Sequence, residues 1–237
     1  MDEANTRNFY EGSYRGAGFG AQRRYPNEEM LRFVARHYGA VPAAARSGIS
    51  LLEVGCGSGA NLWVLAREGF DTHGLDLSAE GLALCEEMLR SWGTRASLRE
   101  GDMTTLPYEP TSFDAVLDVF SSNCLDEAGF GRFLDETARV LKPGGRLFTF
   151  TPHKASDAFT DHAPARLIDA STLDGIRRES SPYAGNLYPF RFTTNEELAV
   201  ALEARGFVVT SSEQVRRSYR GGAEWFAFAV VAAEKRE

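Results

Sequence analysis

Short apolar runs alternate along the chain with longer stretches in which apolar residues recur every three to four positions. The first strong run covers residues 49–54 and precedes a helical pattern over 61–68, and a second run at 70–75 precedes a second helical pattern. The apolar face of that second helix is made of Leu82, Cys85, Met88, Leu89 and Trp92. Because strands that alternate with amphipathic helices form βαβ units, the pattern predicts an α/β protein.

The alternation continues towards the C-terminus. The remaining strand candidates lie at 96–100, 115–119, 146–151, 207–210 and 224–233. The dense turn Lys142-Pro143-Gly144-Gly145 stands directly before one of them, and a capping-box pattern from Thr194 to Glu197 opens a helix that Gly206 can end. The sum is about seven strands with helices between them.

Two segments depart from this rhythm within what we expect to be one domain over 1–237. A helix starts near Pro26, and the Gly- and Tyr-rich stretch before it is expected to be mobile, within an N-terminal helical lid over 1–40. Residues 152–192 are rich in Pro, His, Asp, Ser and Tyr. Their length is typical of a functional insertion, so we expect them to cover an acceptor site.

Composition narrows the class of protein. The formal charge of -7 gives no general attraction for nucleic acid or an anionic membrane. The three cysteines, Cys56, Cys85 and Cys124, show neither CxxC pairing nor a zinc-like grouping, which fits a reducing compartment. The chain starts without a basic and apolar leader and contains no run long enough to span a bilayer. A cytoplasmic location is therefore expected.

A glycine turn offers the first chemistry. In the run from Leu51 to Asn61, Gly55, Gly57 and Gly59 stand where a buried strand turns into a helix. Glycine lets the backbone approach a ligand closely, and a helix start presents unpaired N–H groups to polar ligand atoms. Taken alone, this turn is also consistent with an ordinary α/β connection.

Asp76 strengthens the prediction of a nucleoside ligand. It ends the second strand, where a carboxylate can accept hydrogen bonds from both ribose hydroxyls. Over roughly residues 49–151 the chain resembles the class I S-adenosylmethionine-dependent methyltransferases. The resemblance lies in the order of four motifs: the glycine turn, Asp76, Gly101-Asp102-Met103 and Leu141 to Gly145. The resemblance implies a Rossmann-like fold with helices on both faces. Its sheet would have seven mostly parallel strands and an antiparallel last strand.

The resemblance also implies cofactor-binding roles. Gly55, Cys56 and Gly57 would pack against the methionine part of S-adenosylmethionine, and Glu53 would hold its ammonium group directly or through water. Asp76 would bind the ribose, Leu77 and Met103 would flank the adenine, and Asp102 would accept from its amino group. Asp118 would lie near the methionine end, and Tyr14 would contact the cofactor from the N-terminal segment.

Two other functions remain open at this point. An NAD-dependent oxidoreductase also uses a glycine turn and a ribose-binding acid, but dinucleotide sites favour G-x-G-x-x-G, whereas this chain spaces its glycines as G-x-G-x-G. A non-catalytic module that binds S-adenosylmethionine or S-adenosylhomocysteine would retain the same residues.

The methyl acceptor is harder to predict. A small molecule that accepts on oxygen or nitrogen is expected, with a sugar or natural-product intermediate favoured by the individual character of the insertion. His153 follows the fifth strand directly and is the leading candidate for a general base. Arg23, Arg24 and Tyr25 could hold an acidic acceptor.

Several classes of partner are not expected. The run from Asp118 to Asn123 lacks the Pro-Pro-aromatic signature of nucleic-acid and glutamine amino-methyltransferases. The Asp-Asn metal pair of catechol-type enzymes is also missing, so no metal is expected. The chain is expected to act as a monomer or homodimer without nucleic acid or membrane.

Overall fold

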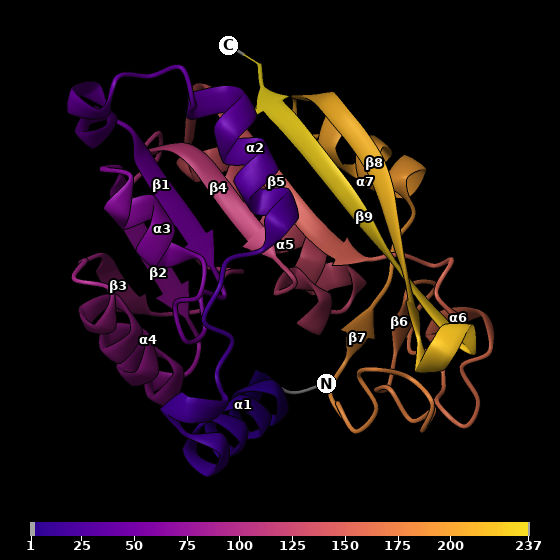
Figure 1. Ribbon diagram of the computed structural model, residues 1–237. Coiled ribbons are helices and arrows are strands. Elements are labelled where there is room, and N and C mark those ends of the chain that lie inside the picture. The colour runs from indigo at the N-terminus through magenta and orange to yellow at the C-terminus, as the bar shows by residue number, and fades with distance from the viewer. Residues whose placement is uncertain (1–2, 237) are drawn as a thin grey trace.

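The computed structural model describes residues 3–236 and contains a seven-stranded sheet in the order β3-β2-β1-β4-β5-β9-β8 (Figure 1). Its strands are β1 Ser50–Val54, β2 Asp71–Asp76, β3 Ser97–Glu100, β4 Phe113–Val119, β5 Leu141–Pro152, β8 Phe207–Tyr219 and β9 Glu224–Lys235. The first five pair in parallel, whereas β9 is antiparallel to both β5 and β8. The predicted sheet, with its antiparallel last strand, is confirmed.

The helices begin where the sequence supplies caps. They are α1 Glu3–Ala17, α2 Glu28–Tyr38, α3 Leu62–Arg67, α4 Ala79–Ser91, α5 Glu127–Val140, α6 Asp157–Thr160 and α7 Asn195–Glu203. The Asn27 side chain accepts from the first backbone N–H groups of α2, and Asp126 does the same for α5. Thr194 and Glu197 form the predicted capping box at the start of α7.

Successive strand residues face opposite sides of the sheet, and each side has its own core. On one side Leu51 and Phe148 pack in a cluster with Phe33 of α2; on the other, Leu52 and Leu147 pack with residues of α5 and α7. In Figure 1, α2 crosses in front of the strands while α5 and α7 lie behind them. Burial on both faces explains the near-continuous apolar runs of the central strands. The expected helices on both faces are confirmed.

Three segments differ from the sequence-based prediction. A 15-residue helix, α1, occupies the segment that was expected to be mobile. The strand expected to end at residue 210 continues to Tyr219 and pairs with β9 along its whole length. The glycine turn before the fifth strand lies within the bounds of β5, where the pairing with β4 jumps from Leu141 to Arg146.

The segment 153–192 forms a small layer at the carboxyl edge of the sheet. It contains α6 and a two-stranded antiparallel sheet of β6 Thr172–Leu173 and β7 Phe190–Arg191. The α6 helix packs on β9, and β7 packs on η3 Ser122–Cys124, the short helical turn after β4. This arrangement places the insertion next to the ends of β4 and β5. Among the described residues, no helix combines the length and apolarity needed to cross a bilayer.

Candidate functional site

The glycine turn after β1 is required by both backbone geometry and space. Gly55, Gly57 and Gly59 have φ values of +64°, +49° and +81°, a region that residues with a side chain rarely adopt. A Cβ atom on Gly55 would lie 2.3 Å from Cβ of Ser121, and one on Gly57 would lie 2.5 Å from the hydroxyl of Tyr14. The turn is therefore packed tightly between the loop after β4 and helix α1.

Asp76 joins the end of β2 to this turn. Its Oδ2 accepts from the backbone N–H of Gly57 at 2.7 Å, and its Oδ1 accepts from that of Ser78 at 2.9 Å. Burial raises the pKa of Asp76, while these two hydrogen bonds act in the opposite direction. A carboxylate offers about four lone-pair positions, so Asp76 keeps acceptor capacity for a ligand.

A cavity of about 250 Å³ opens at the carboxyl edge of the sheet. Six of the predicted cofactor-binding residues line it: Tyr14, Gly55, Asp76, Leu77, Asp102 and Met103. Asp102 is fixed by its own turn, because it accepts from the backbone N–H of Thr104 at 2.8 Å and from its hydroxyl at 2.7 Å. Three separate loops and helix α1 thus contribute these residues to one wall of a single cavity.

Three other predicted residues lie behind this wall rather than on it. Cys56 and Gly57 belong to the turn itself, and Cys56 is buried beside Cys85. Glu53 is 2% exposed, and burial raises its pKa to about 8. Its Oε1 accepts from the amide of Asn61 at 2.5 Å, whereas its Oε2 has no hydrogen-bond partner among the described residues. A buried oxygen of this kind suits a ligand that donates a hydrogen bond.

Asp118, which was predicted to lie near the methionine end of the cofactor, does not line the cavity. It is fully buried. Its Oδ2 accepts from the hydroxyls of Ser122 and Thr149, both at 2.6 Å, and its Oδ1 accepts from the backbone N–H of Ser122 at 2.9 Å. The carboxylate is satisfied within the protein, so its visible role is to hold the loop after β4.

That loop presents Phe120, a residue that the sequence interpretation did not select. Phe120 lines the cavity with a φ of +59°, an unfavourable conformation for an aromatic residue. Its ring lies 4.7 Å from Tyr183, 5.9 Å from Phe228 and 6.0 Å from Phe190, measured between ring centroids. We call Phe120, Tyr183, Phe190 and Phe228 the aromatic wall. The available sequence signal was the position of Phe120 directly after a buried strand.

Helix α1 covers the cavity and contacts both of its sides. Towards β3 and α4, Arg7 pairs with Glu100 at 2.9 Å and Arg15 pairs with Glu80 at 3.0 Å. Towards the insertion, the hydroxyls of Tyr10 and Tyr188 are 2.9 Å apart. Because Tyr10 and Tyr14 also line the cavity, the helix provides lining residues as well as cover.

The structure does not bring His153 to the cavity. Its Nδ1 accepts from the backbone N–H of Ala155 at 2.9 Å, and the side-chain amide of Gln214 on β8 lies 3.4 Å from the same nitrogen. Burial lowers the pKa of His153. The residue follows β5, as predicted, but its ring lies with β8 and α7 rather than with the lining residues. We do not assign it a role in catalysis.

The fold and these loops define a Rossmann-like protein with a nucleoside-binding site at the carboxyl edge of its sheet. Within residues 3–236, no group of three or more His, Cys, Asp or Glu side chains is arranged to hold a metal ion.

Comparisons with known proteins narrow this class. Residues 51–145 match the model of the methyltransferase domain family. The chain is 33% identical over 190 residues to the phthiotriol/phenolphthiotriol dimycocerosates methyltransferase of Mycobacterium leprae, covering 74% of this chain and 66% of that protein. It is 38% identical over 128 residues to the fatty-acid O-methyltransferase of Mycolicibacterium smegmatis, covering 53% of this chain and 45% of that protein.

Solved structures agree in fold. The Burkholderia thailandensis 1,6-didemethyltoxoflavin-N1-methyltransferase, solved with bound 1,6-didemethyltoxoflavin and S-adenosylhomocysteine, superimposes with a TM-score of 0.64 at 19% identity, covering 98% of this chain and 88% of that one. Residues 51–145 belong to the methyltransferase domain family, and the fold of the whole chain is that of class I S-adenosylmethionine-dependent methyltransferases. The match of this chain covers less than two thirds of the length of either curated relative.

The described residues fit the cofactor of this family. The unpartnered buried Oε2 of Glu53 is suited to an ammonium donor, and Asp76 retains acceptor capacity for ribose hydroxyls. Leu77 and Met103 supply apolar surface to the cavity. The tight approach of Tyr14 to Gly57 leaves no room for a side chain on the turn.

Proposed function

We propose that this protein transfers a methyl group from S-adenosylmethionine to an oxygen atom of an apolar small molecule. The main support for this proposal is that one cavity joins the donor side to the acceptor side. The same space is lined by the donor-side residues Asp76 and Met103 and by Phe120, Tyr10 and Pro189 from the acceptor side. A donor and an acceptor can therefore meet without crossing a protein wall.

Each donor-side residue has a stated role in this proposal. Glu53 holds the ammonium group, Asp76 the ribose, and Asp102 the adenine amino group, with Leu77 and Met103 beside the ring. When bound, S-adenosylmethionine supplies a methyl group already activated by its sulfonium centre. The chain's own contribution is then to orient the acceptor and to exclude water, as the aromatic wall and α1 are placed to do.

The aromatic wall supports an apolar acceptor rather than the sugar that the sequence favoured. Phe120 lines the cavity, and Tyr183, Phe190 and Phe228 pack behind it in the aromatic core. The names of the two relatives, which refer to dimycocerosates and fatty acids, point in the same direction. Within this proposal, residues 1–40 form the lid of one domain over 1–237, and residues 152–192 cover the acceptor.

Binding and turnover test the proposal in two steps. S-adenosylhomocysteine should raise the melting temperature, and Asp76→Ala should abolish this shift, whereas Asp71→Ala, at the exposed start of the same strand, should preserve it. Release of S-adenosylhomocysteine is then measured with apolar alcohols, carboxylic acids and amines. An equal thermal shift with NAD would contradict the donor assignment, and binding without turnover on any acceptor would indicate a non-catalytic module.

A further inference from the structure

Helix α1 presents two tyrosines, four residues apart, to the cavity. Tyr14 lies over the glycine turn, because its hydroxyl would be 2.5 Å from a Cβ atom on Gly57. Tyr10 stands one turn earlier, and the centroid of its ring lies 6.0 Å from that of Tyr14. The Tyr10 hydroxyl is 2.9 Å from that of Tyr188, which directly precedes the cavity-lining Pro189. Tyr14 therefore lies on the donor side of the cavity and Tyr10 on the acceptor side.

The Tyr188 hydroxyl receives one hydrogen bond and must give another. The residue is 1% exposed, and the side-chain amide nitrogen of Asn186 donates to its hydroxyl at 3.1 Å. An amide nitrogen only donates, so the hydrogen of Tyr188 cannot be placed along this contact. A buried O–H group without an acceptor is costly. Among the described residues, the remaining partner of this oxygen is the hydroxyl of Tyr10, so Tyr188 donates to Tyr10.

This direction leaves the hydrogen of Tyr10 for the cavity. Tyr10 accepts from Tyr188, and within residues 3–236 its hydroxyl has no second hydrogen-bond partner. Burial raises the pKa of both tyrosines, so both hydroxyls keep their hydrogens near neutral pH. Tyr10 is thus set to donate to a ligand and not to take a proton from it. The series of hydrogen bonds ends at the amide of Asn186, which takes up no proton, so it fixes a direction and carries no proton away.

We infer that Tyr10 binds the methyl-accepting oxygen by donating a hydrogen bond to it, and that Tyr188 and Asn186 are positioning residues that fix the direction of this bond. The inference rests on the proposed function. A hydroxyl oxygen has two lone pairs, so one accepts from Tyr10 while the other faces the methyl group. A protonated amine has only hydrogens to offer and would set them against the hydrogen of Tyr10. Tyr10 is therefore the residue that selects an oxygen acceptor over an amine.

Binding to the complex with S-adenosylhomocysteine tests this contact without requiring turnover. The probes are 1-octanol and its methyl ether, 1-methoxyoctane, whose oxygen has lone pairs but no hydrogen. Because Tyr10 donates, Tyr10→Phe should raise Kd about fivefold for both probes and leave Kd for S-adenosylhomocysteine unchanged by calorimetry. A rise for the alcohol alone would mean that Tyr10 accepts a hydrogen bond instead. That result, an unchanged Kd for both probes, or no binding of either probe to the unaltered protein would each overturn the inference.

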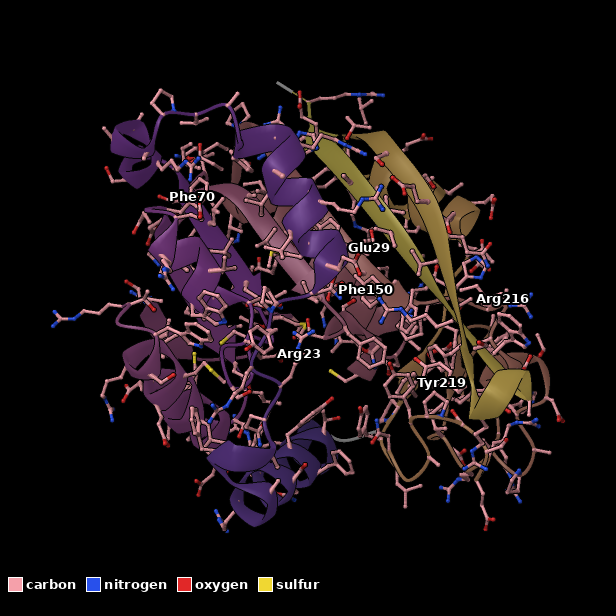
Figure 2. All side chains as sticks on the ribbon, viewed as in Figure 1. Arg23, Glu29, Phe70, Phe150, Arg216 and Tyr219 are labelled. Carbon is pink, nitrogen blue, oxygen red and sulfur yellow. The ribbon has the colours of Figure 1, made fainter. Side chains whose placement is uncertain are left out.

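Tyr219→Phe is the matched control for the loss of one hydroxyl. Tyr219 is also half-buried, but it ends β8 and lies away from α1 (Figure 2). Kd for both probes should be unchanged in this variant, and a fivefold rise equal to that of Tyr10→Phe would overturn the assignment to Tyr10. Turnover separates the two proposals. Normal methyl transfer with no effect of Tyr10→Phe on the probes overturns the inference alone, whereas the expected effect without methyl transfer to any acceptor overturns the proposed function.

A double-mutant cycle tests the positioning role of Tyr188. Tyr188→Phe removes the hydroxyl that orients Tyr10, and it should raise Kd for 1-octanol about twofold to threefold. Adding Tyr188→Phe to Tyr10→Phe should raise Kd no further, because the hydroxyl that Tyr188 orients is already missing. A purely structural role of Tyr188 would instead multiply the two effects. Multiplied effects, or an unchanged Kd in Tyr188→Phe, would overturn the positioning role.

Discussion

The donor and acceptor sides of the cavity are built by different means. On the donor side, short turns between adjacent strands and helices present Gly55, Asp76 and Asp102, and both carboxylates accept from backbone N–H groups. On the acceptor side, aromatic residues come from the loop after β4, the insertion and β9, and their contacts are mostly between rings.

This difference follows from what each side must recognise. A donor shared by the whole family is bound by hydrogen bonds whose geometry is set by local turns. An acceptor that differs between relatives is met by apolar packing, which tolerates changes in shape better than a hydrogen-bond network does. The two sides meet at the loop after β4, where Ser121 touches the glycine turn and Phe120 begins the aromatic wall.

The largest effect is expected where the two sides touch. In Gly55→Ala, the new Cβ would lie 2.3 Å from Cβ of Ser121 at a φ of +64°. We expect a loss on the order of 3 kcal/mol in the free energy of unfolding and loss of S-adenosylhomocysteine binding. Gly144→Ala is the matched control, since Gly144 has a φ of +71° but no atom within 4 Å of a Cβ. Equal losses of unfolding free energy in the two variants would show that the contact with Ser121 is not the cause.

The next prediction tests whether Asp118 supports the loop after β4 or contacts the ligand. Asp118→Ala leaves the hydroxyls of Ser122 and Thr149 without their buried acceptor, and we expect a loss of about 3 kcal/mol by denaturant unfolding. Asp114→Ala, on the same strand but in a partly exposed pair with Lys142, should cost about 1 kcal/mol. A normal unfolding free energy in Asp118→Ala, with weakened S-adenosylhomocysteine binding, would instead place this carboxylate on the ligand.

A smaller effect is expected in the pH dependence of the free energy of unfolding, through Glu53. Burial raises the pKa of Glu53 from 4.5 to about 8, so the folded state holds a proton that the unfolded state releases between these values. This contribution to stability is complete below about pH 4.5, falls as pH rises and levels off above about pH 8. Its slope is at most about 1.4 kcal/mol per pH unit. Denaturant unfolding of Glu53→Gln should show a flatter profile over this interval, and parallel profiles would refute the assignment.

The smallest effect is expected at His153. Its ring contacts Gln214 and the backbone of Ala155 rather than the cavity, so His153→Ala should keep kcat and KM within about twofold in the acceptor assay. A hundredfold fall in kcat with normal folding would mean that this histidine reaches the acceptor in a state different from the one described.

The sequence was most informative on the donor side. The apolar runs of β1 and β4, the glycine turn and Asp76 lie close together in the chain and obey local rules, so both the sheet and this wall could be predicted. Phe120 could not, because its positive φ depends on the loop that Asp118 holds from inside the core. The length of β8 could not be predicted either, because its part beyond residue 210 is half-exposed and polar and only its pairing with β9 makes it a strand.

Charged contacts attach helix α1 on one of its two sides only. Its pairs from Arg7 to Glu100 and from Arg15 to Glu80 are exposed, so salt screens them over a distance of about 10 Å at 0.1 M. The contact between Tyr10 and Tyr188 on the other side carries no charge. Added salt should therefore loosen the helix from the donor side while it stays attached to the insertion. The dissociation rate of S-adenosylhomocysteine should then increase.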